Sequence, residues 1–298
     1  MRRDSQLSLP TFSVQGDYLK GIKGIFLSHL DGQFLMSKCW IRTASAKCLL
    51  RALHLVAGEN PVPLRFVFYL RWFAGEEISK LCDFQDSLIL DGSLIQDDNV
   101  RRLVAGYKLS LWSLDVSTIN FLIKSLWELK PVAILEFGSG ISTIYFTRIM
   151  VDLHQGTNRV FMYSIEQDEE FAFLVRERLR EVGLDRFARV LHAPLIEQAI
   201  EGKIIPCYSL PPDVLASFLI DIKPDLIIVD GPSGKRGARF GTLPLVREYV
   251  QDQAVFFLDD GLRDEELAVA QQWTKLTYIR IRGIHLLGKG LISGRVSK

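Results

Sequence analysis

Apolar and polar positions change pattern near residue 105 of the chain. Before that point the pattern is irregular, and only Ala44–Ala57 and Val62–Phe84 show the apolar spacing that is typical of a helix. After it, short apolar runs of strand length alternate with longer amphipathic segments of helix length. We therefore predict an accessory region at 1–105 and a regular domain at 106–298.

The regular domain is predicted to start with a helix at 113–130, which Ser113 or Asp115 can cap and which Pro131 ends. Strands are then predicted at 132–137, 159–165, 189–192, 226–229, 254–258, 276–282 and 285–296. The helices predicted between them are 142–153, 167–182, 243–251 and 265–275.

Continuous apolar strands that alternate with helices are typical of a parallel sheet with both faces covered. No helix separates the last two strands, which indicates an antiparallel hairpin at one edge. The predicted fold class is therefore α/β and Rossmann-like, with a mostly parallel seven-stranded sheet, helices on both faces and an antiparallel C-terminal edge hairpin. Ligands of such sheets bind at the carboxyl ends of the strands, so the residues that follow each strand are the first candidates for a site.

A glycine-rich turn (EFGSGIST, 136–143) follows the first strand. Its glycines allow the backbone to approach a ligand, and the next helix offers free N–H groups at its start. A dinucleotide fingerprint would need a third glycine where the chain has Thr143. Glu136, two residues before the first glycine, suits a ligand with an amine or another cationic group. The alternative is a tight turn with no ligand.

Glu166 follows the second strand. A carboxylate at this place can accept hydrogen bonds from both hydroxyls of a ribose. The alternative is an acidic residue that the dipole of the following helix favours. The glycine-rich turn nearby favours ribose binding.

Three carboxylates, Asp230, Asp259 and Asp260, follow the fourth and fifth strands. Such oxygen donors suit a hard divalent cation such as Mg²⁺. Alternatively, one aspartate caps the next helix and another accepts hydrogen bonds from loop amides. The sequence leaves both interpretations open.

A glycine-rich loop with several basic residues lies at 231–239. A phosphate-binding loop is excluded, because Val229 and Arg236 stand where glycine and Ser or Thr would be needed. The loop is predicted either to bind an anionic or sugar-like substrate, with Lys235 as a candidate residue, or to be a solvated loop.

Composition narrows the classes of protein. Of 298 residues, 48% are hydrophobic and 24% are charged, and the net charge of +1 gives no reason to expect a nucleic-acid partner. The sequence contains no run of 18 apolar residues, so no transmembrane segment is predicted. Four widely spaced cysteines without a CxxC pair favour reduced thiols and a cytoplasmic protein.

In combination, these motifs resemble the class I S-adenosylmethionine-dependent methyltransferases. The matching residues are ILEFGSGIST (134–143), SIE (164–166), LHAPL (191–195), DGP (230–232) and LDDG (258–261), with RDEE (263–266) at the next helix. They are most similar to a bacterial branch with GSG.ST, DGP and DD motifs, and to catechol-type O-methyltransferases. The resemblance runs from about residue 110 to the end of the sequence, and residues 1–105 have no match.

The resemblance implies a methyltransferase fold with a site for S-adenosyl-L-methionine. The residues that it assigns to the cofactor are Glu136, Gly138, Ser139, Gly140, Ser142, Thr143, Glu166, Gln167, His192, Ala193 and Asp230. Glu136 and the glycines would hold the methionine moiety, Glu166 the ribose, and His192 with Ala193 the adenine. Asp230, Asp259 and Asp260 would be the metal ligands, although the family usually has Asn at the last of these positions.

The function expected from this resemblance is methyl transfer to a small hydroxylated molecule or a saccharide, with Asp230 and Lys235 as the catalytic candidates. Two alternatives remain: an NAD(P)-dependent oxidoreductase on a Rossmann-like fold, and a non-catalytic scaffold that binds an adenosyl ligand. Residues 1–105 are expected to act as a lid, a substrate-binding region or the contact of a homo-oligomer.

Overall fold

The computed structural model of the chain describes residues 48–49, 52–74, 90–107, 109–155, 157, 159, 161–233 and 237–298. All of them belong to one compact unit, Arg42–Lys298. Of the two helices predicted in the accessory region, residues 52–57 are helical and α3 spans Leu64–Ala74. The rest of these two predictions lies outside the described residues.

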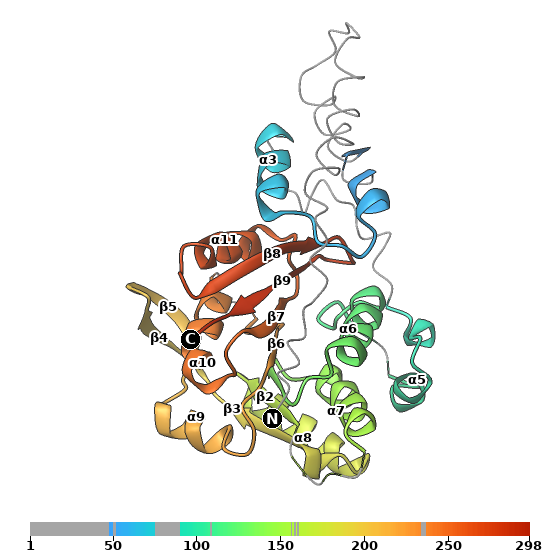
Figure 1. The fold of residues 1–298 in the computed structure, drawn as a ribbon. Helices are drawn as coiled ribbons and strands as arrows, with labels where there is room; N and C mark the ends of the chain where they lie inside the picture. The colour runs from blue at the N-terminus through green and yellow to red at the C-terminus, as the bar shows by residue number, and fades with distance from the viewer. Residues whose placement is uncertain are drawn as a thin grey trace, which may run out of the picture. The chain divides into compact units, whose positions relative to one another are not determined.

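A seven-stranded sheet forms the centre of the described part, in the order β3-β2-β1-β6-β7-β9-β8 (Figure 1). The strands are β1 (Ile134–Phe137), β2 (Met162–Glu166), β3 (Ala188–His192), β6 (Leu226–Val229), β7 (Ala254–Leu258), β8 (Ile279–His285) and β9 (Leu291–Val296). The first five are parallel, and β9 runs antiparallel to both β7 and β8. This confirms the predicted α/β, Rossmann-like fold with an antiparallel edge hairpin.

Helices cover both faces of this sheet, with α6 and α7 on one side and α10 and α11 on the other (Figure 1). The α-helices after α3 are α5 (Asp98–Leu103), α6 (Val116–Leu129), α7 (Ile141–Leu153), α8 (Glu169–Glu181), α9 (Pro212–Phe218), α10 (Thr242–Val246) and α11 (Asp264–Trp273). The 3₁₀ turns are Gly92–Leu94, Asp185–Phe187, Ala238–Gly241 and Arg247–Tyr249. All four residues of β1 are buried, as expected for a strand covered on both faces.

The start of α6 follows from its cap. Asp115 accepts hydrogen bonds from the backbone N–H groups of Ser117 and Thr118, at 2.9 and 3.1 Å, so it is the N-cap that the sequence offered as an alternative to Ser113. The apolar stripe of α6 joins a buried cluster that also contains Val100 and Val104. Part of the accessory region therefore packs against the regular domain, and the predicted boundary at 105 stays a prediction.

Several features differ from the prediction, and the helices α5 and α9 were not predicted. A second sheet, the hairpin β4 (Leu195–Ile200) and β5 (Lys203–Tyr208), was not predicted. His285 ends β8 and does not start the last strand. The last strand begins only at Leu291, because Gly288 and Gly290 have positive φ in the connecting loop.

The order of the strands changes direction at β1. The chain moves outward from β1 through β2 to β3 and then returns to place β6 on the other side of β1. The carboxyl ends of β1 and β6 therefore meet at a switch point, which is where open α/β sheets bind ligands. No helix in the described part of the chain is long and apolar enough to cross a membrane.

Candidate functional site

A cavity of about 1280 Å³ opens at the carboxyl ends of β1, β2 and β6. Sites for small molecules usually measure roughly 300–1,000 Å³, so this one has room for more than one small ligand. The predicted site residues that line it are Gly138, Ser139, Gly140, Ser142, Glu166, Gln167, Asp230 and Asp260. Lys235 lies outside the described residues.

Two glycines bring the loops after β1 and β6 together at the floor of this cavity. Gly138 has a φ of +90°, and a Cβ on it would lie 2.9 Å from the backbone nitrogen of Gly231. A Cβ on Gly231 would lie 2.8 Å from the Cα of Gly138. Both positions require glycine, because the two backbones touch.

Glu136 is fully buried and is not among the residues that line the cavity. Its Oε2 accepts hydrogen bonds from the hydroxyls of Thr143 (2.5 Å) and Ser164 (2.8 Å), while its Oε1 has no hydrogen-bond partner in the part of the chain that the structure describes. Burial raises the pKa of Glu136 to about 7, although the neighbouring hydroxyls oppose this. Thr143 also accepts a hydrogen bond from the N–H of Gly140, at 3.0 Å. Glu136 therefore holds the glycine-rich turn in place through Thr143, without lining the cavity itself.

Glu166 reaches the same turn from β2. Its Oε2 accepts hydrogen bonds from the backbone N–H (2.8 Å) and the hydroxyl (3.0 Å) of Ser139, and its Oε1 accepts one from the N–H of Asp168. Gln167, the next residue, exchanges hydrogen bonds with Ser233 of the loop after β6. Glu166 and Gln167 thus connect the ends of three strands along the wall of the cavity.

His192 and Ala193 are not among the lining residues of the cavity. His192 ends β3 and is the register partner of Glu166, and the N–H of Ala193 donates to the carbonyl of Glu166 at 2.7 Å. In this structure they support β2, and their predicted contact with adenine stays a prediction.

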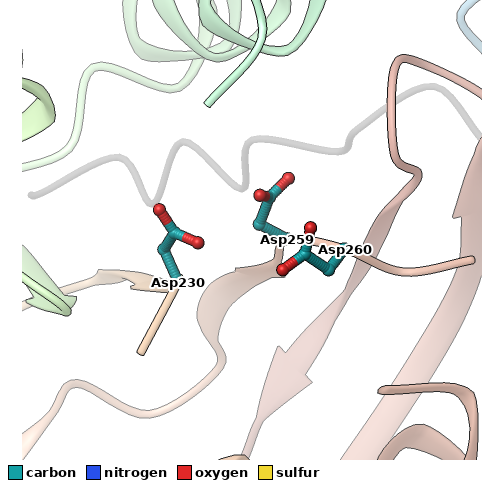
Figure 2. A group of neighbouring side chains, drawn as sticks. All are labelled: Asp230, Asp259 and Asp260. Atoms are coloured by element: carbon teal, nitrogen blue, oxygen red, sulfur yellow. The ribbon is translucent and has the colours of Figure 1, made fainter. Parts of the chain in front are cut away.

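Asp230 follows β6, and Asp259 and Asp260 follow the adjacent strand β7 (Figure 2). One oxygen atom of each carboxylate lies within 4.8 Å of the others. Burial and the nearby Asp259 raise the pKa of Asp230 well above its usual range. Burial and Asp260 raise the pKa of Asp259 to about 6. The topology therefore brings the predicted carboxylates together.

Two cations compensate these carboxylates: Arg239, from the basic loop that was predicted to lie beside the site, and Lys289, which the sequence did not indicate. Arg239 is buried and lies 3.1 Å from Asp260 and 3.6 Å from Asp230, and it donates to the backbone carbonyls of Asp230 and Asp259. The ammonium of Lys289 lies 3.0 Å from Asp260 and 3.4 Å from Asp259. Although burial works in the opposite direction, these cations and Arg263 hold the pKa of Asp260 below its usual value.

The donor set by itself suits Mg²⁺, since hard cations prefer carboxylate oxygens and no hydrogen bond from the described residues reaches either oxygen of Asp259. The surrounding charge does not suit it, because Lys289 already lies against two of the three carboxylates. The site as a whole therefore does not fit a divalent cation, and no catalytic step is assigned to one.

Tyr208 is a further residue at the site that was not predicted. It ends β5, lines the cavity, and has a buried hydroxyl without a hydrogen-bond partner among the described residues. A Cβ on Gly231 would lie 2.5 Å from this hydroxyl oxygen. The sequence could not indicate this residue because the hairpin that carries it was missed.

No protein-family model matches the chain, and no curated protein matches it. Its fold is similar to that of an O-methyltransferase from Bacillus cereus solved in complex with SAH, which is 16% identical over 71% of this chain and 99% of that chain, with a TM-score of 0.50. A putative O-methyltransferase from Klebsiella pneumoniae is 19% identical over 72% of this chain and 99% of that chain, with a TM-score of 0.49. The first similarity confirms the Rossmann-like methyltransferase fold.

Proposed function

We propose that this chain is an S-adenosylmethionine-dependent methyltransferase. The observation that carries the proposal is the glycine-rich turn, held by Glu136 and Glu166 at the switch point, which opens into a cavity with room for two ligands. The Bacillus cereus enzyme of the same fold, solved with SAH, supports it. Thr143 counts against an NAD(P)-dependent oxidoreductase, because its side chain stands where the dinucleotide fingerprint needs glycine.

The cofactor is proposed to lie along the turn. The backbone of Gly138 to Gly140 and the first N–H groups of α7 would hold its methionine moiety. Glu166 would accept hydrogen bonds from the ribose hydroxyls through the lone pairs that Ser139 and Asp168 leave free. Glu136 would act through Thr143 and not by direct contact.

When bound, S-adenosylmethionine supplies an electrophilic methyl group on its sulfonium. The side chain of Asp230 lines the cavity with 16% of its surface exposed, and it is proposed to accept the proton of the acceptor hydroxyl while that oxygen attacks the methyl carbon. A bond between oxygen and carbon forms, and the bond between carbon and sulfur breaks, which leaves a neutral thioether. The protein would contribute mainly by aligning the two ligands and excluding water. Lys235 remains a second catalytic candidate.

The proposed acceptor is a small hydroxylated or sugar-type molecule and not a nucleic acid. Charged side chains line the cavity beside Asp230, among them Arg263, Glu265 and Lys289, and they can bind several hydroxyl groups. A cytoplasmic location is proposed from the free thiols of Cys48 and Cys207. For residues 1–105 we keep the proposal made from the sequence, namely that they act as a lid, a substrate-binding region or the contact of a homo-oligomer.

Calorimetry with S-adenosylhomocysteine and NAD⁺ tests the proposal. We expect S-adenosylhomocysteine to bind and Glu166→Gln to weaken it by about ten- to a hundredfold, because a hydrogen bond to a charged group contributes roughly 1.5–3 kcal/mol. Glu169→Gln, an exposed change in the first turn of α8, is the matched control. Tight binding of NAD⁺ alone, or an unchanged affinity in Glu166→Gln, would contradict the proposal. Methyl transfer to a panel of catechols and sugars then separates an enzyme from a binding scaffold.

A further inference from the structure

The three carboxylates at the ends of β6 and β7 are the kind of donor set that binds a divalent cation. In this structure a positively charged side chain of the same chain lies against them. We infer that the ammonium of Lys289, which lies against Asp259 and Asp260, takes the place of the metal ion in this cluster and excludes a divalent cation from it.

The first argument is position. The ammonium of Lys289 lies 3.0 Å from Asp260 Oδ1 and 3.4 Å from Asp259 Oδ2. The side chain of Lys289 is only 15% exposed and that of Asp259 is fully buried. An ammonium this deep in the cluster is a fixed charge and not a side chain that reaches in from solvent.

The second argument is that the backbone holds Lys289 in this position. The carbonyl of Lys289 accepts a hydrogen bond from the N–H of Leu262 at 3.0 Å, and the carbonyl of Gly290 accepts one from the N–H of Gly261 at 2.7 Å. The β8–β9 loop is therefore bonded to the residues that directly follow Asp260.

The third argument is that the loop needs a glycine on each side of the lysine. Gly288 has a φ of +49°, and a Cβ there would overlap the carboxylate of Asp115, the N-cap of α6. Gly290 has a φ of +88°, and a Cβ there would lie 2.6 Å from the side chain of Leu262. These contacts fix the loop between α6 and the end of β7, so Lys289 has little freedom to leave.

The fourth argument is charge. Arg239 and Arg263 also contact Asp260, so three cations already surround the acidic cluster, in which Glu266 is the fourth carboxylate. The cluster is close to balanced with Lys289 in place. A divalent cation would add two positive charges beside an ammonium, and like charges at this distance repel strongly in a buried site.

Titration of the full chain with Mn²⁺, followed by electron paramagnetic resonance, tests this inference independently of any methyl transfer. We expect the wild-type protein to show no saturable binding and Lys289→Met to bind Mn²⁺ at least about tenfold more tightly. A second change, Asp260→Ala in the Lys289→Met background, removes the oxygen donor and should remove the gained binding. Lys275→Met, which changes an exposed lysine, is the control and should behave as wild type.

Two results would overturn the inference. One is saturable Mn²⁺ binding to the wild-type protein that Asp260→Ala abolishes. The other is the same Mn²⁺ affinity in wild type and Lys289→Met. Lys289→Arg keeps the positive charge and the fold of the loop, so it covers the case in which Lys289→Met does not fold. It should exclude Mn²⁺ as wild type does, and binding by this variant would count against the inference.

Discussion

Glu136 shows how a buried carboxylate makes stability depend on pH. Its pKa is raised to about 7 in the folded protein by burial, against 4.5 for the free side chain. Between these two values the folded state therefore binds more protons than the unfolded state, and the free energy of unfolding falls as the pH rises. Asp259 and Glu266, whose pKa values are raised by burial to about 6 and about 7, contribute changes of the same sign.

Glu136→Gln should make this decline shallower, since the amide keeps the shape of the side chain and does not titrate. Relative to wild type, the variant should lose less stability between pH 5 and pH 8, by up to a few kcal/mol at roughly 1.4 kcal/mol per pKa unit. Urea unfolding across this range measures it, and Glu197→Gln on exposed β4 is the control. An identical pH slope in wild type and Glu136→Gln would show that Glu136 does not carry the effect.

At the scale of single residues, the sequence predicted which residues belong to the site. It was less successful in predicting which partner each residue contacts. Glu136, Thr143 and Glu166 all lie at or beside the switch point, as expected from their places near the carboxyl ends of strands or in the turn that follows one. The sequence did not show that Thr143 turns back to Glu136, because a hydrogen-bond partner depends on the path of the loop and not on spacing.

At the scale of elements, the β1–α7 connection depends on one glycine more than on the other. A Cβ on Gly138 would meet backbone atoms of the β6 loop at 2.9 Å, and its φ is +90°. Gly140 has an extended φ, and the nearest atom to a Cβ there is the Ser142 hydroxyl at 3.8 Å. Gly138→Ala strains two loops at once, whereas Gly140→Ala adds an ordinary contact.

Gly138→Ala should therefore lower the free energy of unfolding by about 2 kcal/mol or more, through strain at positive φ and overlap with backbone. Gly140→Ala should change it by less than about 1 kcal/mol. Thermal and urea unfolding of the two variants give the comparison. Equal losses in both would mean that the close approach of the two loops does not limit the choice of residue at 138.

The parallel strands β1, β2 and β6 of the main sheet were predictable because buried parallel strands are continuous apolar runs. The β4–β5 hairpin was not, because its strands expose several side chains and Pro206 interrupts the second. The turn of this hairpin could nevertheless have been predicted from the sequence. Glu201 and Gly202 both have positive φ, and a glycine between two apolar runs is the usual signal of such a hairpin.

At the scale of the whole molecule, Arg239 joins parts of the chain that are distant in sequence. Its guanidinium contacts the loop after β6, the loop after β7 and, through Glu266 at 3.5 Å, the helix α11.

Arg239→Met should cost roughly 3–5 kcal/mol of stability, since it leaves buried carboxylates without a partner. Arg148→Met, which breaks a pair with Asp152 along the partly exposed face of α7, should cost about 1 kcal/mol or less.

Urea unfolding of these two variants measures the difference. A loss in Arg239→Met no larger than that in Arg148→Met would mean that the buried network contributes no more than a surface pair. The acids of this network were predicted, because strand ends of one sheet must lie together. Of its cations, Arg239 was expected in the basic loop beside the site, whereas Lys289 was not predicted, because it comes from a hairpin loop whose position depends on the whole sheet.

The place of β9 between β7 and β8 has a consequence for the order in which the protein forms. During synthesis the two aspartates after β7 leave the ribosome a few seconds before Lys289, at roughly 5–20 residues per second. Until β9 pairs with β7, these aspartates remain hydrated and need no counter-charge. The step that inserts β9 covers them and delivers Lys289 at the same time. Burial of the two aspartates and the arrival of Lys289 thus coincide, so the nascent chain does not have to hold these acids away from water without this third cation.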